Sequence, residues 1–261
     1  MARHEVWTLY LQNRSPIMAR HGAELVHVDA GPVIRGIEFE KSADGSSKGL
    51  LTELQRRNLA ALATLVTFPP RAIVYREDAE LSWIFIAKIG VLKAFREMPS
   101  GKRRVTSFLF PGDVFGLAEN GRYVNTIQTV TNATLYQIPS EALSEMLRRD
   151  PELQFQFLCK ITHELRQGQR HSIVIARKDA AGRLAMFLSM LEQNEHAGGA
   201  HSGWIQLPMS RTDLAEYLGL SLESVSRATS ALARRGIVTF QGGHAARVID
   251  RARFEKLVNA L

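Results

Sequence analysis

The apolar residues in the middle of the chain occur in short segments rich in β-branched and aromatic side chains. Residues such as Gly90, Pro99 and Gly101 separate these segments and predict turns between them. Six strands are expected, at residues 72–75, 83–86, 91–95, 105–110, 127–130 and 134–138. Short strands joined by tight turns are typical of a small antiparallel barrel or roll, and we expect one over residues 51–139.

Helical spacing of apolar residues precedes and follows these strands. Before the strands, the helical spacing extends from Leu51 to Leu65, and Phe68-Pro69-Pro70 ends it. After the strands, the pattern predicts a short helix over residues 140–147. A long helix then begins at Asp150-Pro151, with Asp as the cap and Pro in the first turn. We expect residues 140–178 to be a dimerisation segment.

Six residues of the long helix have the 3, 4, 3, 4, 3 spacing of a two-stranded coiled-coil seam. They are Leu158, Ile161, Leu165, Gly168, Ser172 and Ile175. We expect this seam to pair with a second copy of the chain in a homodimer. The alternative is that the same stripe packs on the chain's own roll, and a second apolar edge at Ile173-Val174 would let the helix make both contacts.

From Leu207 to Gly236 the pattern predicts a helix, a tight turn and a second helix. Ser210 and Asp213 can form a capping box at the first helix, Gly219 can end it, and Ser221 can cap the second. At about 100° per residue, the second helix has one apolar and one polar face. The apolar face carries Val225, Ala228, Thr229 and Leu232, and the polar face carries Glu223, Ser226, Arg227, Ser230 and Arg234.

The polar face offers groups that match the edges of DNA bases. Arg can bond to guanine O6 and N7, Glu can accept from cytosine N4, and Ser is adaptable. We expect Glu223, Ser226 and Arg227 to read bases, because the start of the second helix of a helix-turn-helix meets them. The expected contacts to the DNA backbone are Ser210, Arg211, Ser221, Ser230, Arg234 and Arg247. The alternative is an ordinary helical hairpin with a solvated polar face.

A wing is predicted after this helical pair. Residues 237–240 and 247–249 flank Gly242-Gly243, which suits a hairpin turn, and Asp250 can cap a last helix. With a hinge at Lys178-Asp179, the DNA-binding unit would comprise residues 179–261.

Composition narrows the possible classes of protein. The formal charge of +7 favours a polyanionic partner, but residues 179–261 contain 9 Lys and Arg against 8 Asp and Glu, so most of the charge lies upstream. No run of about 18 apolar residues and no signal peptide occur, so we expect a cytoplasmic protein without a membrane contact. The single cysteine, Cys159, excludes an internal disulfide.

The Leu207–Gly236 segment resembles the DNA-reading segment of the Crp/Fnr family of bacterial transcription regulators. The run PGDVFGL at residues 111–117 is similar to a turn of that family's cyclic-nucleotide-binding roll, and Glu223 followed by Ser226-Arg227 resembles the reading motif of the Fnr and FixK branches. The resemblance covers residues 51–261. It implies an α+β fold with an N-terminal antiparallel β-roll, a long dimerisation helix and a C-terminal winged helix-turn-helix. It also implies double-stranded DNA with palindromic TTGAT-like half-sites, an activator role, and RNA polymerase as a partner.

The sequence departs from the cyclic-AMP-responsive members of that family. Those members hold the ribose with a Glu, the phosphate with an Arg-Ser pair and the adenine with a Thr-Ser pair. The corresponding residues here are Leu117, Val124-Asn125 and Gly168-Gln169. Leu117 and Val124 supply neither the charge that a phosphate needs nor the acceptor that a ribose needs. Arg122 is the remaining candidate to bind a phosphate. We therefore expect regulation without cyclic AMP.

No cofactor and no metal are expected from the residues. An iron–sulfur cluster needs several thiolates, and the apolar neighbours of Cys159 indicate an inert buried thiol. His163 and His171 lie about 80° apart around the helix and form no tight chelating pair. A haem or a small-molecule effector stays an open alternative.

Two other functions are compatible with a six-stranded roll. A barrel enzyme of the cupin kind would need clustered histidine and carboxylate ligands, and residues 51–139 contain no histidine, so no enzymatic activity is expected. The other is a metabolite- or haem-sensing roll that acts through protein contacts. Residues 1–50 are expected to be an N-terminal extension, to which the sequence assigns no role.

Overall fold

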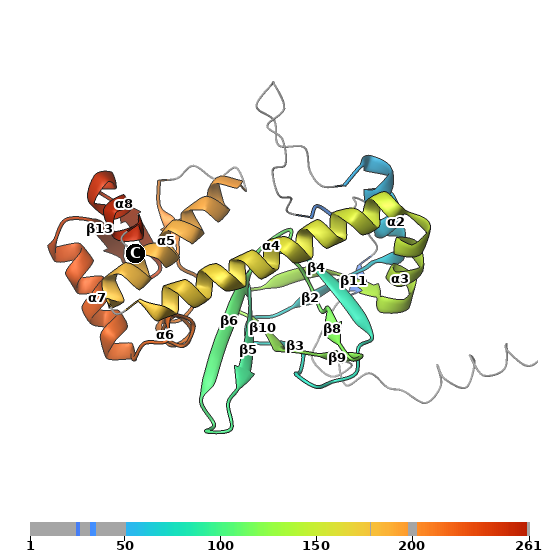
Figure 1. Ribbon diagram of the computed structural model, residues 1–261, viewed down its shortest axis with the longest axis horizontal. Helices are drawn as coiled ribbons and strands as arrows, with labels where there is room; N and C mark the ends of the chain where they lie inside the picture. Colours follow the sequence, from blue (N-terminus) through green and yellow to red (C-terminus); the bar gives the residue numbers. More distant parts are fainter. Residues whose placement is uncertain (1–24, 27–31, 35–50, 178, 198–202, 260–261) are drawn as a thin grey trace, which may run out of the picture.

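The computed structural model describes residues 25–26, 32–34, 51–177, 179–197 and 203–259. It has an α+β fold in which one long helix, α4 (Pro151–Ala176), joins two units (Figure 1). A β-roll lies along α4, and a unit built from helices α5 to α8 lies at the C-terminal end of α4 (Figure 1). Among the described residues, no helix is long and apolar enough to cross a membrane.

Two antiparallel sheets form the roll. Their strand orders are β1-β2-β11-β4-β7 and β3-β10-β5-β6, and β8 pairs with β9 in a separate two-stranded sheet. The six predicted strands are present, and β1, β2 and three further short strands, β7, β8 and β9, add to them. The bounds are β1 (Leu25–Val26), β2 (Thr64–Phe68), β3 (Ile73–Tyr75), β4 (Trp83–Ile89), β5 (Leu92–Glu97), β6 (Arg103–Leu109), β7 (Val114–Phe115), β8 (Ala118–Glu119), β9 (Arg122–Tyr123), β10 (Thr126–Thr129) and β11 (Ala133–Pro139).

The first helix is shorter than its apolar spacing predicts. Helix α2 (Glu53–Leu62) begins with a capping box at Thr52 and ends where Ala63 becomes extended. The expected continuation to Leu65 is wrong, because the next five residues form β2 and pair with β11. Three of those residues are β-branched, and their pairing on the sheet outweighs the helical period.

The helices after the roll confirm the predicted break at Asp150. Helix α3 (Ser140–Arg149) ends two residues beyond its predicted end, and the Asp150 side chain caps α4 by accepting from Leu153 N at 2.9 Å. Lys160 of α4 is buried and donates to Asp113 Oδ1 at 3.1 Å, which fastens α4 to the 111–117 turn of the roll.

The seam residues lie on the side of α4 that faces away from the roll. Leu158, Ile161, Leu165 and Ile175 are 42 to 63% exposed, and Gly168 and Ser172 are exposed as well. Residues of the opposite side, including Leu153 and Phe157, are buried against the roll and its neighbours. The alternative that the seam packs on the chain's own roll is therefore wrong.

The C-terminal unit has the predicted winged helix-turn-helix architecture. Its helices are α5 (Ala180–Ala197), α6 (Arg211–Leu218), α7 (Leu222–Arg234) and α8 (Arg251–Asn259). Strands β13 (Val238–Gln241) and β14 (Ala245–Val248) form the wing, and β12 (Ile205–Gln206) adds a third strand that was not predicted. Asp250 caps α8 by accepting from Arg253 N at 3.0 Å. Lys178 of the expected hinge and nearly all of the expected extension at 1–50 lie outside the described residues.

Candidate nucleic-acid interface

The turn between α6 and α7 is built by the residues that were predicted to cap the two helices. Ser210 Oγ accepts from Asp213 N at 3.0 Å, and Asp213 Oδ2 accepts from Ser210 N at 3.2 Å, which completes the capping box. Gly219 ends α6 in the left-handed conformation, with φ of 64°, and Ser221 Oγ accepts from Ser224 N at 3.1 Å to start α7. The capping box thus starts α6, and Gly219 and Ser221 form the turn that leads into α7.

Helix α7 divides into the two predicted faces. Val225, Ala228 and Leu232 are buried in the core of the C-terminal unit, and Thr229 is half-buried. All five residues of the predicted polar face are exposed: Glu223, Ser226, Arg227, Ser230 and Arg234. The apolar face thus holds this helix against the C-terminal unit, and the polar face is exposed to solvent.

Two of the predicted base-reading residues form an ion pair with each other. Arg227 Nη1 lies 2.9 Å from Glu223 Oε1, and the side chains are 68% and 75% exposed. Arg227 Nη2 also donates to Ser224 Oγ at 3.4 Å. An exposed pair of this kind contributes only about 0.3–0.5 kcal/mol, so a base that offers better partners can open it.

The residues predicted to hold the DNA backbone fall into two groups. Arg211, Arg234 and Arg247 are exposed, and among the described residues none of the three has an acidic group within 4.0 Å. Ser230 is exposed beside them. The hydroxyls of Ser210 and Ser221 instead donate to Asp213 Oδ2 at 2.8 Å and to Ser224 Oγ at 2.9 Å. Of the predicted backbone contacts, these three arginines thus present exposed positive charges that no described acidic group neutralises.

The structure adds a contact between this unit and the roll that the sequence did not predict. Lys93 of β5 donates to Asp213 of α6, and both residues are buried. Burial alone would raise the pKa of Asp213, but the hydrogen bonds from Lys93 and Ser210 lower it below its usual value. The one signal in the sequence was a lysine inside the apolar run of residues 91–95. Its partner could not be found, because it lies 120 residues away.

A histidine and a tyrosine join α4 to the same helix. His171 Nε2 donates to the carbonyl oxygen of Tyr217 at 2.8 Å, and the two rings stack with their centroids 4.1 Å apart. Phe108 of β6 packs on Tyr217 and Phe187. Helix α6 therefore touches both α4 and the roll, so the helix-turn-helix is docked on the rest of the chain.

The comparisons with known proteins agree with this architecture. A model of the cyclic nucleotide-binding domain matches residues 65–150, and a model of the Crp-like helix-turn-helix domain matches residues 182–257. Together they cover more than half of the chain. Nitrogen fixation regulation protein FixK of Azorhizobium caulinodans is 28% identical over 76% of this chain and 81% of its own length. Transcriptional activator protein anr of Pseudomonas aeruginosa is 28% identical over 65% of this chain and 70% of its own length.

Among solved structures, FixK2 from Bradyrhizobium japonicum is 29% identical with a TM-score of 0.71, covering 76% of this chain and 98% of that chain. The chain belongs to the Crp/Fnr family. It is a DNA-binding transcription regulator of the Crp/Fnr type, and the family consists of transcription regulators and not of enzymes.

In this Crp/Fnr regulator, aromatic rings occupy the inside of the roll next to the nucleotide-contact positions. Tyr75 and Tyr123 stack with centroids 3.8 Å apart, and Phe85 and Phe115 stack at 5.4 Å. The Tyr123 hydroxyl donates to the Trp83 carbonyl at 2.9 Å. Burial raises the pKa of both tyrosines, so both stay neutral.

Two of the residues expected to replace nucleotide contacts of cyclic-AMP-responsive relatives lie at the surface. Leu117 and Val124 are 41% and 40% exposed. Arg122, the remaining candidate for a phosphate contact, donates to the Asp78 carbonyl at 2.6 Å. Cys159 is a buried free thiol. The described residues contain no group of three or more His, Cys, Asp or Glu side chains that could hold a metal ion.

Proposed function

We propose that this regulator acts as a homodimer that binds a palindromic DNA element with TTGAT-like half-sites and activates transcription without cyclic AMP. Residues 51–139 are the sensor roll, 140–178 the dimerisation segment and 179–261 the DNA-binding unit. The protein would work in the cytoplasm, with RNA polymerase as its second partner. The observation that carries the proposal is the exposed polar face of α7, which a buried apolar face holds in place.

The chemistry of the half-site supports Glu223 and Arg227 as a matched reading pair. TTGAT contains one G·C pair, whose major-groove edge offers two acceptors on guanine and one donor on cytosine. Arg227 can bond to guanine O6 and N7 while Glu223 accepts from cytosine N4. Ser226 then faces a neighbouring base. Arg211, Arg234 and Arg247 supply the phosphate contacts that position the helix in the groove.

The exposed seam of α4 supports the homodimer. Apolar side chains with coiled-coil spacing face solvent along this helix in a single protomer, and a second copy with the same seam would cover them. A two-fold axis along α4 presents two reading helices to two half-sites, about 34 Å apart on one side of the duplex. A palindrome follows from that symmetry.

The roll supports independence from cyclic AMP. The Tyr75–Tyr123 stack occupies space beside the substituted positions, and Arg122 is engaged by a backbone carbonyl. FixK of Azorhizobium caulinodans, whose name states a role in the regulation of nitrogen fixation, is among the relatives of this chain.

Fluorescence anisotropy with a labelled palindrome, at constant salt and without added nucleotide, tests the proposal. We expect Arg227→Ala to weaken binding by about 1 to 3 kcal/mol and to reduce the preference for G·C over A·T in each half-site. Arg57→Ala is the matched control. Arg57 of α2 forms an i,i+4 ion pair with Glu53 at 3.1 Å, and the two side chains are about as exposed as those of the Glu223–Arg227 pair.

An Arg227→Ala protein with unchanged affinity and base preference would contradict the assignment of the reading helix. Tightening of binding by added cyclic AMP would contradict the effector-free model. Failure of the pure dimer to select any duplex from a random-sequence pool would favour the alternative, a roll that acts through protein contacts.

A further inference from the structure

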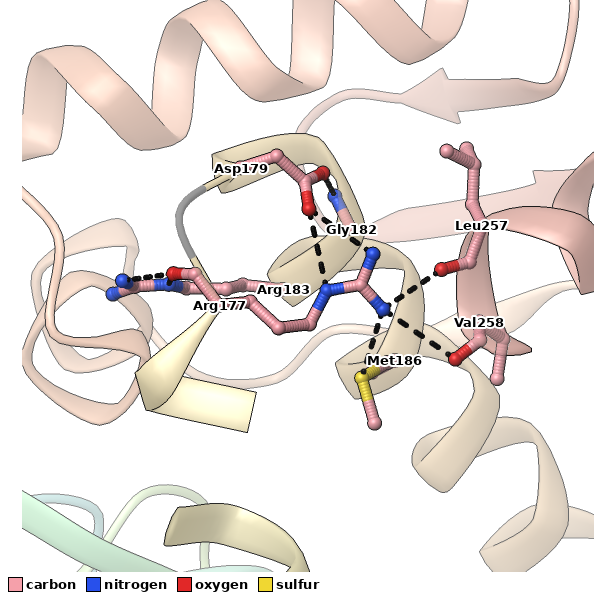
Figure 2. A network of polar contacts seen from close by, with 7 residues as sticks. All are labelled: Arg177, Asp179, Gly182, Arg183, Met186, Leu257 and Val258. Atoms are coloured by element: carbon pink, nitrogen blue, oxygen red, sulfur yellow. Dashed lines mark hydrogen bonds and ion pairs between the residues drawn. The ribbon is translucent and has the colours of Figure 1, made fainter. Parts of the chain in front are cut away.

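Three helices end at one point beside the junction of α4 and α5. The last residues of α4, α6 and α8 each present backbone carbonyls that no further helical turn can satisfy. Two arginines, Arg177 and Arg183, lie between these ends. Arg177 donates to the Leu257 carbonyl of α8, and Arg183 donates to the carbonyl of Arg177, which caps α4 (Figure 2). Arg183 also donates to the Leu218 carbonyl of α6. The negative ends of three helix dipoles thus meet two guanidinium groups.

Arg177 connects the end of α4 to the end of α8. Its Nη1 donates to the Leu257 carbonyl at 3.0 Å, to the Val258 carbonyl at 3.5 Å and to Met186 Sδ at 3.5 Å. Its Nε and Nη2 donate to Asp179 Oδ2 at 3.2 and 3.0 Å. Only 10% of the Arg177 side chain is exposed, so these contacts replace most of its hydration.

Arg183 connects the end of α4 to the helix-turn-helix. Its Nε donates to the Arg177 carbonyl at 2.7 Å, and its Nη1 donates to the Leu218 and Gly219 carbonyls at 2.9 and 3.3 Å. Leu218 is the last residue of α6 and Gly219 forms the turn before α7. A side chain of α5 therefore bridges the dimerisation helix and the turn that aims the reading helix.

A glycine in the first turn of α5 leaves room for this arrangement. A Cβ atom at Gly182 would lie 2.5 and 2.6 Å from the two carboxylate oxygens of Asp179 and would also overlap Arg177 Nη2. The Gly182 N–H donates to Asp179, which in turn holds Arg177 (Figure 2). Burial alone would raise the pKa of Asp179, but the bonds from Gly182 and Arg177 lower it, so the carboxylate stays charged. Any larger residue at 182 would disturb the Arg177–Asp179 contact.

We propose that Arg177 and Arg183 are positioning residues that set the separation and the angle of the two reading helices in the dimer. This inference rests on the proposed function, because it requires a dimer axis along α4 and DNA reading by α7. Ile175, the last seam residue, lies close to the turn: its Cγ2 is 4.0 Å from the position of a Cβ on Gly219. The distance from the seam to the turn before the reading helix is therefore short, and Arg183 bridges the end of α4 and that turn by hydrogen bonds.

The spacing of the half-sites is the property that such positioning residues control. Adding one base pair moves a half-site by about 3.4 Å and rotates it by about 35° around the duplex axis. A dimer with rigidly placed reading helices binds palindromes of one spacing tightly. In a dimer with a loosened junction the reading helices can move to reach both half-sites at other spacings as well. Spacing preference therefore reports on the junction, while base preference reports on α7.

The experiment measures dissociation constants for palindromes whose half-site centres are about 8 to 13 base pairs apart. We expect the wild-type dimer to lose at least about tenfold in affinity one base pair away from its best spacing, since contacts to one half-site are lost. Arg177→Ala and Arg183→Ala should weaken binding at the best spacing and flatten the profile, with G·C preference within a half-site retained. Arg183→Lys keeps the charge but lacks the guanidinium fork that spans the Arg177 and Leu218 carbonyls, so it should restore part of the preference.

Arg251→Ala is the matched control, because Arg251 makes two bonds to Glu192, at 2.6 and 2.7 Å, that join α8 to α5 inside the C-terminal unit. It should lower the melting temperature and leave the spacing profile unchanged. Gly182→Ala keeps every donor and stands in for the arginine variants if those fail to fold. Light scattering checks that each variant is still a dimer.

Sharp wild-type-like profiles in Arg183→Ala and in Gly182→Ala would overturn the inference. A flattened profile in Arg251→Ala would also overturn it, since general loosening of the unit would then explain the effect. Absence of binding by the wild-type protein at every spacing would instead contradict the proposed function.

Discussion

The buried ion pair between Lys93 and Asp213 makes a quantitative prediction, because it is a charged contact between the roll and the helix-turn-helix. The two side chains are 11% and 13% exposed. Removal of one partner from such a pair leaves a buried charge and costs about 3–5 kcal/mol. Asp213 would keep the hydrogen bonds from Ser210 N and Oγ. We therefore expect Lys93→Ala to cost about 3 kcal/mol, near the lower limit of that range.

Asp213→Ala should cost more than Lys93→Ala, since it leaves Lys93 without its partner and also removes the capping box of α6. Ser210→Ala is the control for the cap, with an expected cost of about 1 kcal/mol. The double variant Lys93→Ala/Asp213→Ala leaves no unpaired charge. Its destabilisation should fall short of the sum of the single variants by about 2 kcal/mol, measured by urea unfolding as a double-mutant cycle.

The pH dependence of the same pair has a defined sign. The pKa of Asp213 is lowered in the folded protein, so its contribution is fully present above the unfolded pKa of about 3.9 and is lost as the pH falls through the lower folded value. The difference in stability between wild type and Asp213→Ala should therefore shrink only below about pH 4. Additive single effects, or a difference that disappears already near pH 6, would refute the reasoning.

Two further variants test the dimer seam and the α4–α6 contact. Leu165→Glu puts a charge on a seam residue that is 63% exposed in one protomer. It should dissociate the dimer in sedimentation experiments and leave the circular dichroism spectrum unchanged. Arg166→Glu, at the next residue and outside the seam, is its control. Burial lowers the pKa of His171, and its bond to the Tyr217 carbonyl raises it in part. Since the unfolded histidine binds its proton more readily, stability should fall as the pH drops below about 6.5, and His171→Gln should make unfolding less pH-dependent there. An equally steep pH dependence in His171→Gln would assign the effect to another group.

Local signals in the sequence predict the helix-turn-helix well. Ser210, Asp213, Gly219 and Ser221 act within three or four residues of themselves, so their capping roles follow from spacing alone, and the two faces of α7 follow from helical geometry. The same applies to Asp150 at the start of α4. The strands of the roll were found because β-branched and aromatic segments alternate with turns.

Contacts between residues that lie far apart in the sequence could not be predicted from it. The two-residue strands β7, β8 and β9 carry too few positions for a periodic signal, and the segment of β2 continues the helical spacing of α2 until it pairs with β11. The Arg177 and Arg183 contacts go to backbone carbonyls, which every residue type possesses. The residue pattern does not show which carbonyls act as acceptors, so only the folded structure identifies these two arginines as links between helix ends.

The Glu223–Arg227 pair has a consequence for how the proposed complex discriminates bases. In the free protein each charge satisfies the other at 2.9 Å. Opposite a G·C pair, guanine supplies acceptors to Arg227 and cytosine supplies a donor to Glu223, so both charges exchange one partner for another. Opposite an A·T pair in the same orientation, adenine N7 still accepts from Arg227, but the adenine amino group replaces guanine O6 and the thymine carbonyl faces Glu223, so each side chain gains one repulsive contact.

In the proposed complex Glu223 would add little to affinity, since a carboxylate close to the phosphates is repelled by them. It would add to specificity, because the wrong base pair opposes both side chains, whereas it would oppose only the arginine if Glu223 were absent. Discrimination against an unsuitable partner by repulsion is a general route to selectivity, and here it needs only an exposed i,i+4 pair on a rigidly held helix. Rigid attachment of α7 to the rest of the C-terminal unit matters for the same reason. A reading helix that could shift by a base pair would avoid the repulsive contacts, and the dimer would then no longer discriminate against the wrong base pair.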